Sequence, residues 1–459
     1  MKNKIIQLTI FFFFVLLAPN SQAQTKKWTI EDCVNYALKN NISIKQSVLD
    51  TLTATINKRE VIGNFLPSLN ANASHSWNIG LNQNITTGLL ENQTIQFTSA
   101  GLNSNIAIYN GLQNQNGLRR AKLQILASQY NLSKMKDDIS LNVANSFLQI
   151  LFNKENLKVQ QEILINDEKQ LTRSEELVKA GSIPRGDLLD TKATVASDEQ
   201  KVIIAENILL LSKLSLAQLL QLKDFQNFDV VDSNYNANQS VVMAEKPESI
   251  FEKAKQERVE IKIAKTNLSA AETQVKISRG AYQPSLTGFY SFSTRASYSE
   301  RIVGLDGNNN PILASPLPLF DQFSDNKGHS FGLQLNIPVF NGFSVRNNVD
   351  RSKIGLESAK IAYNRAELDL ERNVYTAFTD ANGALNTYES AVSALEARQE
   401  AFNYAKEKFD VGLMNAFDYN QSQTLFASAQ SEVIRAKYDY IFKVKVVEFY
   451  FGIPIIQKQ

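Results

Sequence analysis

Two kinds of hydrophobic periodicity alternate along this chain. Within residues 344–411, apolar side chains recur at alternating intervals of four and three residues, at Val374, Phe378, Ala381, Leu385, Tyr388, Val392 and Leu395. This heptad spacing is typical of a helix packed in a coiled coil. Neither 344–411 nor 113–180 contains proline. Each is therefore predicted to form one continuous helix, about 100 Å long at 1.5 Å per residue.

Shorter helical segments accompany the two long ones. They are predicted at residues 28–62 and 187–222 in the first half of the chain, and at 247–280 and 417–451 in the second half. Each is about half as long as a long helix, so two placed end to end would match its length. Thr29 followed by Asp32, and Ser249 followed by Glu252, are typical of capping arrangements where such helices begin.

Between the helices the period changes from 3.6 residues to two. In residues 68–79 serine and asparagine occupy every second position, and in 330–340 the apolar residues Phe331, Leu333 and Leu335 alternate with polar ones. Such alternation indicates strands with one apolar and one wet face. In residues 94–109 the apolar phase shifts near Ser99-Ala100-Gly101, which predicts a β-bulge. The strands form two predicted hairpins, at 66–109 and 283–340, and the second contains a longer loop, 301–328.

The chain contains two repeats with the same order of predicted elements. Gly181 and Asp187 have counterparts in Gly412 and Asp418, at an offset of 231 residues that also relates IYNG, which ends at Gly111, to VFNG. The first predicted repeat covers 24–245: a helix, hairpin 66–109, long helix 113–180, helix 187–222 and linker 223–245. The second covers 246–459: helix 247–280, hairpin 283–340, long helix 344–411, helix 417–451 and a tail.

The first residues have the features of an export signal. Lys2 and Lys4 precede an apolar stretch at 5–18, and Ser21-Gln22-Ala23 is a small-residue cleavage pattern. We predict a signal peptide at 1–23, because a membrane anchor needs about 20 apolar residues. No apolar run of transmembrane length is recognised after it. The single cysteine, Cys33, excludes an internal disulfide and is expected to pack as a small apolar residue.

An exported chain with apolar strand faces fits the bacterial outer membrane. Lipid cannot satisfy the hydrogen bonds of a bare strand edge, so the sheet must close into a barrel. Four strands are too few, since small barrels need about eight. Two copies would supply eight strands and three copies twelve, and the strand count permits either. Candidates for the aromatic girdle at the membrane interfaces are Trp77, Phe97, Tyr109, Tyr290, Phe331 and Phe340.

Several segments together resemble the TolC-like outer-membrane efflux protein family, or outer membrane factors. They include TIEDCVNYALKNNISIKQ, FLPSLNANAS with YQPSLTGFYS, IYNG with VFNG, the two glycine-turn-aspartate segments and the closing EVIRAKYDYIFKVKVVEFYFG. The resemblance implies a mainly α fold with a membrane β-barrel, in which a homotrimer forms a 12-stranded barrel and a periplasmic α-helical tunnel. It also implies a periplasmic adaptor (membrane fusion) protein and an inner-membrane RND or ABC pump as partners, and an exit duct for efflux or type I secretion as the function.

The same resemblance assigns roles to the two helix–turn–helix tips. It implies that Gly181, Ser182, Gly412 and Leu413 face the adaptor, although plain helix caps would explain the glycines equally well. It places Asp187 and Asp418 in acidic rings at the periplasmic gate, where a carboxylate at a helix N-terminus is the structural alternative. Gln421 replaces a second acidic position of some relatives, and Asp190 is expected to contribute to the gate instead.

The remaining composition narrows the function further. A net charge of +2 and the lack of a recognisable binding motif argue against nucleic acid. His75 and His329 have no nearby ligating partner in the sequence, and the loop at 306–317 lacks the glycine and glutamate of a calcium site. We therefore predict no metal, no cofactor and no enzymatic activity. A soluble periplasmic coiled-coil adaptor or scaffold is the alternative function, but it does not explain the amphipathic strands. A passive porin, in turn, does not explain the long helices.

Overall fold

The structure, a computed structural model, describes residues 27–83, 88–225, 227–231 and 240–454. The predicted signal peptide at 1–23 lies outside these residues, as do parts of the first hairpin turn, the linker and the tail. The chain divides into two compact units. The first comprises residues 1–47, 132–258 and 367–459, and the second 48–131 and 259–366. Each unit thus takes segments from both sequence repeats, and the division falls inside the two long helices.

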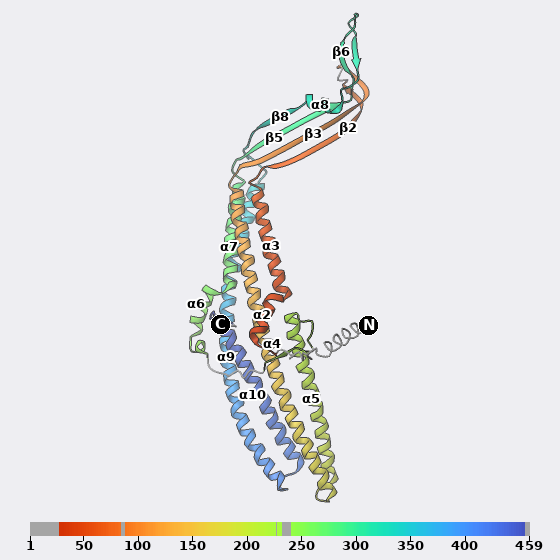
Figure 1. The fold of residues 1–459 in the computed structure, drawn as a ribbon. Helices are drawn as coiled ribbons and strands as arrows, with labels where there is room; N and C mark the ends of the chain where they lie inside the picture. The colour runs from red at the N-terminus through yellow and green to blue at the C-terminus, as the bar shows by residue number, and fades with distance from the viewer. Residues whose placement is uncertain (1–26, 84–87, 226, 232–239, 455–459) are drawn as a thin grey trace, which may run out of the picture. The chain divides into compact units, whose positions relative to one another are not determined.

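Both repeats contain the predicted succession of helix, hairpin, long helix and helix (Figure 1). The first repeat consists of α2 (Ile30–Asn40), α3 (Ile42–Gly63), β2 (Ser68–Gln83), β3 (Leu90–Asn110), α4 (Gln113–Lys179) and α5 (Arg185–Leu220). The second consists of α6 (Pro247–Glu257), α7 (Val259–Gly280), β5 (Ser285–Ser297), β8 (Gly328–Asn336), α9 (Ser344–Asp410) and α10 (Ala416–Tyr450). The fold is mainly helical with four long strands, as predicted.

The leading helix of each repeat is interrupted where one continuous helix was predicted. The first breaks at Asn41, whose Nδ2 donates to the carbonyl oxygen of Leu219 at 2.9 Å and whose Oδ1 accepts from the backbone N–H of Ser43. The second breaks at Arg258, which is buried with its guanidinium 3.8 Å from the ring centre of Phe449. In both cases a buried polar side chain takes a partner distant in sequence, and the backbone leaves the helical conformation there.

The capping predictions have different outcomes. Thr29 forms a capping box with Asp32, whose backbone N–H donates to the threonine Oγ1 at 3.1 Å. The Ser249 prediction is wrong, because α6 begins at Pro247 with Lys246 as its N-cap and no side-chain cap. Proline is favoured in the first turn of a helix because its missing N–H would have no partner there.

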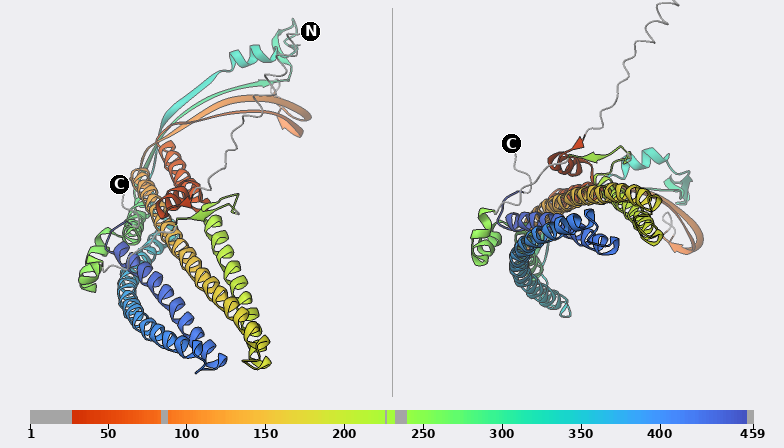
Figure 2. Two further views of the ribbon diagram at one scale, coloured as in Figure 1. Left: turned by 60° about the horizontal axis from the view of Figure 1, so that its bottom comes forward. Right: turned by 90° about the horizontal axis from the view of Figure 1, so that it is seen from below.

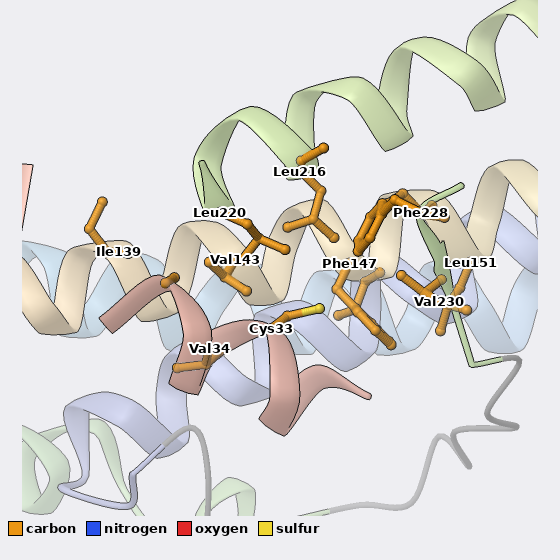
Figure 3. Close-up of a cluster of buried hydrophobic side chains, with 14 of the residues drawn as sticks. Cys33, Val34, Ile139, Val143, Phe147, Leu151, Leu216, Leu220, Phe228 and Val230 are labelled. Carbon is orange, nitrogen blue, oxygen red and sulfur yellow. The ribbon is translucent and has the colours of Figure 1, made fainter. Parts of the chain in front are cut away.

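The first unit has its hydrophobic core where α2, α4 and α5 meet. Figure 3 shows Cys33 and Val34 from α2 packing with Phe147 from α4 and Leu216 from α5. A short parallel pair, β1 (Lys27–Trp28) with β4 (Asp229–Val230), closes this core. Burial raises the pKa of the Cys33 thiol to about 12, so it stays protonated and packs as an apolar group, as predicted.

The coiled-coil seam of α9 is confirmed, with its centre displaced slightly from the predicted residues. Val374 and Ala381 are buried, and three further buried positions fall on small residues, Ala377, Ala384 and Ala391, each one residue before a predicted apolar position. Aromatic stacking joins α9 to α10, for example between Phe409 and Tyr419 at 4.6 Å between ring centres. Both views in Figure 2 show α10 beginning beside the final part of α9, and α5 beginning beside the final part of α4.

The second unit carries a four-stranded antiparallel sheet in the order β2-β3-β5-β8. The last strand stops at Asn336, before Pro338, which cannot donate to a sheet ladder. The loop predicted at 301–328 has structure of its own: a small hairpin of β6 (Arg301–Leu305) and β7 (Pro311–Ala314), and a helix, α8 (Leu319–Asp325). Gln322 of α8 hydrogen-bonds with the backbone of Ser297 and so attaches the helix to β5.

Candidate channel elements

Both helix–turn–helix tips are closed by the same backbone motif. Gly181 and Gly412 have φ angles of 73° and 78°, a conformation that glycine adopts without penalty. After α4 the backbone N–H of Ser182 donates to Leu177 at 2.8 Å, and after α9 that of Leu413 donates to Lys408 at 2.8 Å. These six-to-one bonds define Schellman motifs. The glycines are therefore helix caps, and the exposed Leu413 is available to a partner.

The two proposed gate aspartates occupy equivalent positions. Asp187 and Asp418 are each the third residue of their helix, α5 and α10. The backbone N–H of Asp418 donates to the N-cap Asn415 at 2.8 Å, and Asn415 Nδ2 donates back to the Asp418 carboxylate at 2.9 Å. A carboxylate here is stabilised by the helix dipole. The geometry therefore supports the capping role for Asp418, whereas α5 begins after Pro184 without a side-chain cap; both carboxylates lie in the first turn of their helix, near the tips.

The other two predicted gate residues lie together. Asp190 and Gln421 line a groove of about 820 Å³ between α4, α5 and α10, whose lining does not include Asp187 or Asp418. Asn420 on one wall donates to Thr194 on the other at 3.2 Å. The structure thus brings one pair of the predicted residues to a common groove, and the other pair lies about one helical turn away on the same two helices.

A buried carboxyl pair in the wall of this groove was missed by the sequence analysis. Asp167 of α4 and Asp198 of α5 are each only 3% exposed, and their carboxyl groups hydrogen-bond to each other. Gln423 of α10 donates to Asp167 at 2.8 Å, and Lys201 pairs with Asp198 at 2.7 Å. Burial, followed by the contact with Asp198, raises the pKa of Asp167 to about 7. Three helices are therefore joined through one carboxyl group that titrates near neutral pH.

The register of the large sheet separates its two faces by chemistry. Side chains of paired residues lie on the same face. The pairs Asn72–Gly101, Ser74–Ser99 and Ser291–Asn103 place serine, asparagine and glycine together on one face. These side chains bond to one another, with 2.7 Å between the hydroxyl oxygens of Ser74 and Ser99. This part of the wet face is a layer of small polar groups.

The opposite face is mainly apolar and largely exposed, apart from Thr294 and Ala296, which are buried beside α8. Tyr290 pairs with Phe331 and Leu286 with Leu335, so aromatic and aliphatic residues gather there. In this single chain Phe331 is 80% and Leu333 68% exposed. Of the other girdle candidates, Trp77 is exposed on the same face, Tyr109 pairs with Leu286, and Phe340 is exposed just beyond β8. A face of this kind needs a cover of lipid or protein.

Phe97 is the girdle candidate that the structure places elsewhere. It pairs with Ser76 and so belongs to the wet face, where the guanidinium carbon of Arg295 lies 4.9 Å from its ring centre.

The β-bulge predicted at Ser99-Ala100-Gly101 is absent, because the β2–β3 register runs without a shift through these residues. An irregularity occurs instead between Ala107 and Tyr109, in the pairing of β3 with β5. The apparent change of phase arises because Ile95 and Phe97 are apolar residues on the wet face.

The two histidines and the 306–317 loop take part in local hydrogen bonding. His75 lies 2.8 Å from the hydroxyl of Thr98, and His329 lies 2.9 Å from that of Tyr290. The carboxylate of Asp306 accepts from the backbone N–H groups of Asn308 and Asn310, which lowers its pKa and forms a polar turn. Among the described residues, no group of three or more His, Cys, Asp and Glu side chains is placed to hold a metal ion.

Comparison with known proteins identifies the same arrangement elsewhere. The sequence profile of the outer membrane efflux protein family matches residues 33–221 and 250–444, once in each repeat. The pyoverdine export outer membrane protein OpmQ of Pseudomonas aeruginosa is 24% identical over 359 residues, 77% of this chain and 69% of OpmQ. The outer membrane protein TolC of Vibrio cholerae is 25% identical over 338 residues, 71% of this chain and 68% of TolC.

The likeness extends to solved structures. The CmeC outer membrane channel of Campylobacter jejuni superposes with a TM-score of 0.78, covering 92% of this chain and 85% of CmeC, at 18% sequence identity. VceC from Vibrio cholerae superposes with a TM-score of 0.75, covering 92% of this chain and 96% of VceC, at 15% identity. Sequence and fold therefore point to the same group of proteins.

Proposed function

This chain belongs to the outer membrane efflux protein family, and from that premise we propose that it is the exit duct of a tripartite efflux or type I secretion system. It is a non-enzymatic channel protein of the outer membrane that extends into the periplasm. In the proposed role it passes substrates from an inner-membrane pump to the exterior. The observation that carries the proposal is the sheet, with one uncovered apolar face, one wet face and two free edges.

Closure of that sheet determines the assembly. Strands β2 and β8 are its edge strands, and in lipid their unpaired backbone groups would each cost several kcal/mol. A dimer would close eight strands around an interior just wide enough to be filled by side chains. The wet face instead carries small, hydrogen-bonded serine and asparagine side chains, which suit a water-filled lumen. We therefore favour a homotrimer with twelve strands.

The helix α5 offers a second surface for neighbouring copies. Its length and composition alone would allow it to cross a membrane, which the sequence analysis did not recognise. Exposed apolar residues follow the helix, among them Ile203, Ile204, Leu210 and Leu211. The same helix also packs Leu216 into the core of the first unit. We assign the exposed residues to contacts with a neighbouring protomer's helices in the tunnel.

The tips supply the proposed contacts with the rest of the system. A trimer would present six of them, with Gly181, Ser182, Gly412 and Leu413 facing a periplasmic adaptor. Asp187, Asp418 and Asp190, together with Gln421, would line the gate. The serine and asparagine side chains of the wet face are general hydrogen-bonding groups that suit many solutes, and the relatives named above include a pyoverdine exporter. The adaptor, and an RND or ABC pump, would therefore determine what is exported.

Fractionation combined with mass measurement tests this proposal. The expressed chain should follow the outer-membrane fraction, require detergent for extraction, and give three times the protomer mass by native mass spectrometry. A chain recovered as a water-soluble monomer would contradict the proposal and favour the adaptor alternative. A stable dimer would retain the membrane location but contradict the open twelve-stranded lumen.

A further inference from the structure

Arg295 has an exceptional place on the wet face of the sheet. Its cross-strand partner is Ser99, and the face around it is formed by uncharged residues, including Asn72, Asn103 and Ser291. Of the residues that the register places on this face in β2, β3, β5 and β8, only Glu91 and Arg295 are charged. Glu91 lies six residues from Phe97 along β3, or about 20 Å. Arg295 is thus the one positive charge that the register places on this face, and its immediate neighbours there are uncharged.

The arginine is also held against the strand wall. Its guanidinium carbon lies 4.9 Å from the ring centre of Phe97, within the range of a cation–π interaction. This contact gives Phe97 a packing partner on the wet face. Asn326 Nδ2 donates to the backbone carbonyl of Arg295 at 2.7 Å and anchors the strand beneath it. The charged residues beside Asn326, Asp325 and Lys327, have opposite signs and contribute little net charge.

From this geometry we infer that Arg295, positioned by Phe97, makes the barrel lumen favour anionic over cationic solutes. The inference rests on the proposed function, in which the wet face lines the lumen and three copies surround it. Three positive charges among uncharged neighbours, with Glu91 about 20 Å away along β3, would attract anions such as chloride, phosphate or carboxylates and repel cations at that level of the lumen. The barrel and the acidic tips would then carry opposite charge preferences, so that a solute meets two electrostatic environments along one tunnel.

Reversal potentials in planar lipid bilayers test this assignment. A KCl gradient at low ionic strength is suitable, since the Debye length is about 10 Å at 0.1 M salt. Every protein would also carry Asp187→Ala and Asp418→Ala, so that the tip carboxylates do not determine the result. Relative to this background, Arg295→Gln should lower the chloride-to-potassium permeability ratio by roughly threefold, as expected for a change in potential of about half a kT, which acts on the two ions with opposite sign.

Three further variants make the test specific. Arg295→Lys keeps the charge and should retain most of the anion preference. Arg301→Gln removes a positive charge from the outer β6 hairpin, where its Nε bonds the carbonyl of Ser315, and should leave the ratio unchanged. Ser99→Asp places a carboxylate opposite Arg295 and should lower the ratio as Arg295→Gln does, which decides the matter if the glutamine variant does not assemble.

The outcomes separate the two proposals. A background protein that inserts as a trimer but forms no conducting channel would overturn the proposed function, and this inference with it. Conducting channels whose permeability ratio is unaffected by Arg295→Gln, or by Ser99→Asp where that variant replaces it, would overturn the role of Arg295 alone. An equal effect of Arg301→Gln would also overturn it, because the selectivity would then arise from charge at the outer mouth.

Discussion

At the scale of single residues, the most consequential side chain of the helical unit is Asp167. It is buried between three helices, with Asp198 and Lys201 from α5 and Gln423 and Tyr419 from α10 around it. Its protonated form satisfies the hydrogen bond with Asp198, whereas its ionised form would place two carboxylates in contact. Lys201 offsets part of that repulsion, and burial removes the water that would offset the rest.

The sign of the resulting pH effect follows from linkage. The pKa of Asp167 is about 7 in the folded protein and 3.8 is its ordinary value, so between these pH values the folded state binds more protons than the unfolded state. This group's contribution to stability is therefore complete below about pH 4 and is lost as the pH rises to about 7. We expect the loss to be on the order of 2–4 kcal/mol of unfolding free energy.

Chemical denaturation of the detergent-solubilised protein between pH 4 and pH 8 would measure this effect. Asp167→Asn keeps a hydrogen-bonding side chain that does not ionise, so its stability should depend less steeply on pH than that of the wild type. Glu199→Gln, an exposed carboxylate on α5, is the matched control and should leave the slope unchanged. Parallel pH profiles for wild type and Asp167→Asn would show that the carboxyl pair does not titrate as described.

At the scale of elements, apolar and polar side chains alternate along each strand and so point to opposite faces of the sheet. Leu333 and Gln334 are neighbours on β8 and point to opposite faces, as their partners Gly288 and Thr287 indicate. Exceptions to the alternation have structural causes. Phe289 lies on the wet face because Gly332 opposite it has no side chain; a Cβ there would lie 3.1 Å from the ring. A large apolar residue can thus lie on the wet face where its cross-strand neighbour has no side chain to occupy the same space.

This arrangement predicts that the same substitution is costly at one position and nearly without cost at the adjacent one. Leu333→Arg puts a charge on the lipid-facing side and should cost about 2–4 kcal/mol near the membrane midplane. Gln334→Arg puts it in the lumen and should cost little. Trimer yield after extraction, followed by gel mobility without heating, compares the two. Equal losses for both variants would show that the sheet does not have one lipid face and one water face.

At the scale of the whole molecule, exposed apolar surface is the main evidence for assembly. The uncovered sheet face requires lipid, and the stripe along α5 requires another helix. Both surfaces belong to one chain that also has well-packed cores, so their exposure is not a sign of poor folding. A complete duct therefore depends on contacts that a single protomer cannot make for itself.

The stripe on α5 makes this dependence measurable. Ile204→Gln with Leu211→Gln should weaken the trimer, since burial of each aliphatic side chain contributes about 1.5–3 kcal/mol. Glu199→Gln with Glu206→Gln has the same spacing on the same helix and should not. Native mass spectrometry over a dilution series would report trimer and monomer. Equal dissociation of the two double variants would remove α5 from the interface between protomers.

The sequence by itself determined most of the helices, strands and tips of this protein, because helix and strand periodicity reflects which side of each element is covered. The long helix 344–411 ends in the structure at Asp410, and the tips close at the two predicted glycines. Only the tertiary structure decided the break at Asn41, the side of the sheet on which Phe97 lies, and the pairing of Asp167 with Asp198. Each of these depends on a partner far away in the chain, and local periodicity holds no information about which distant residue will supply it.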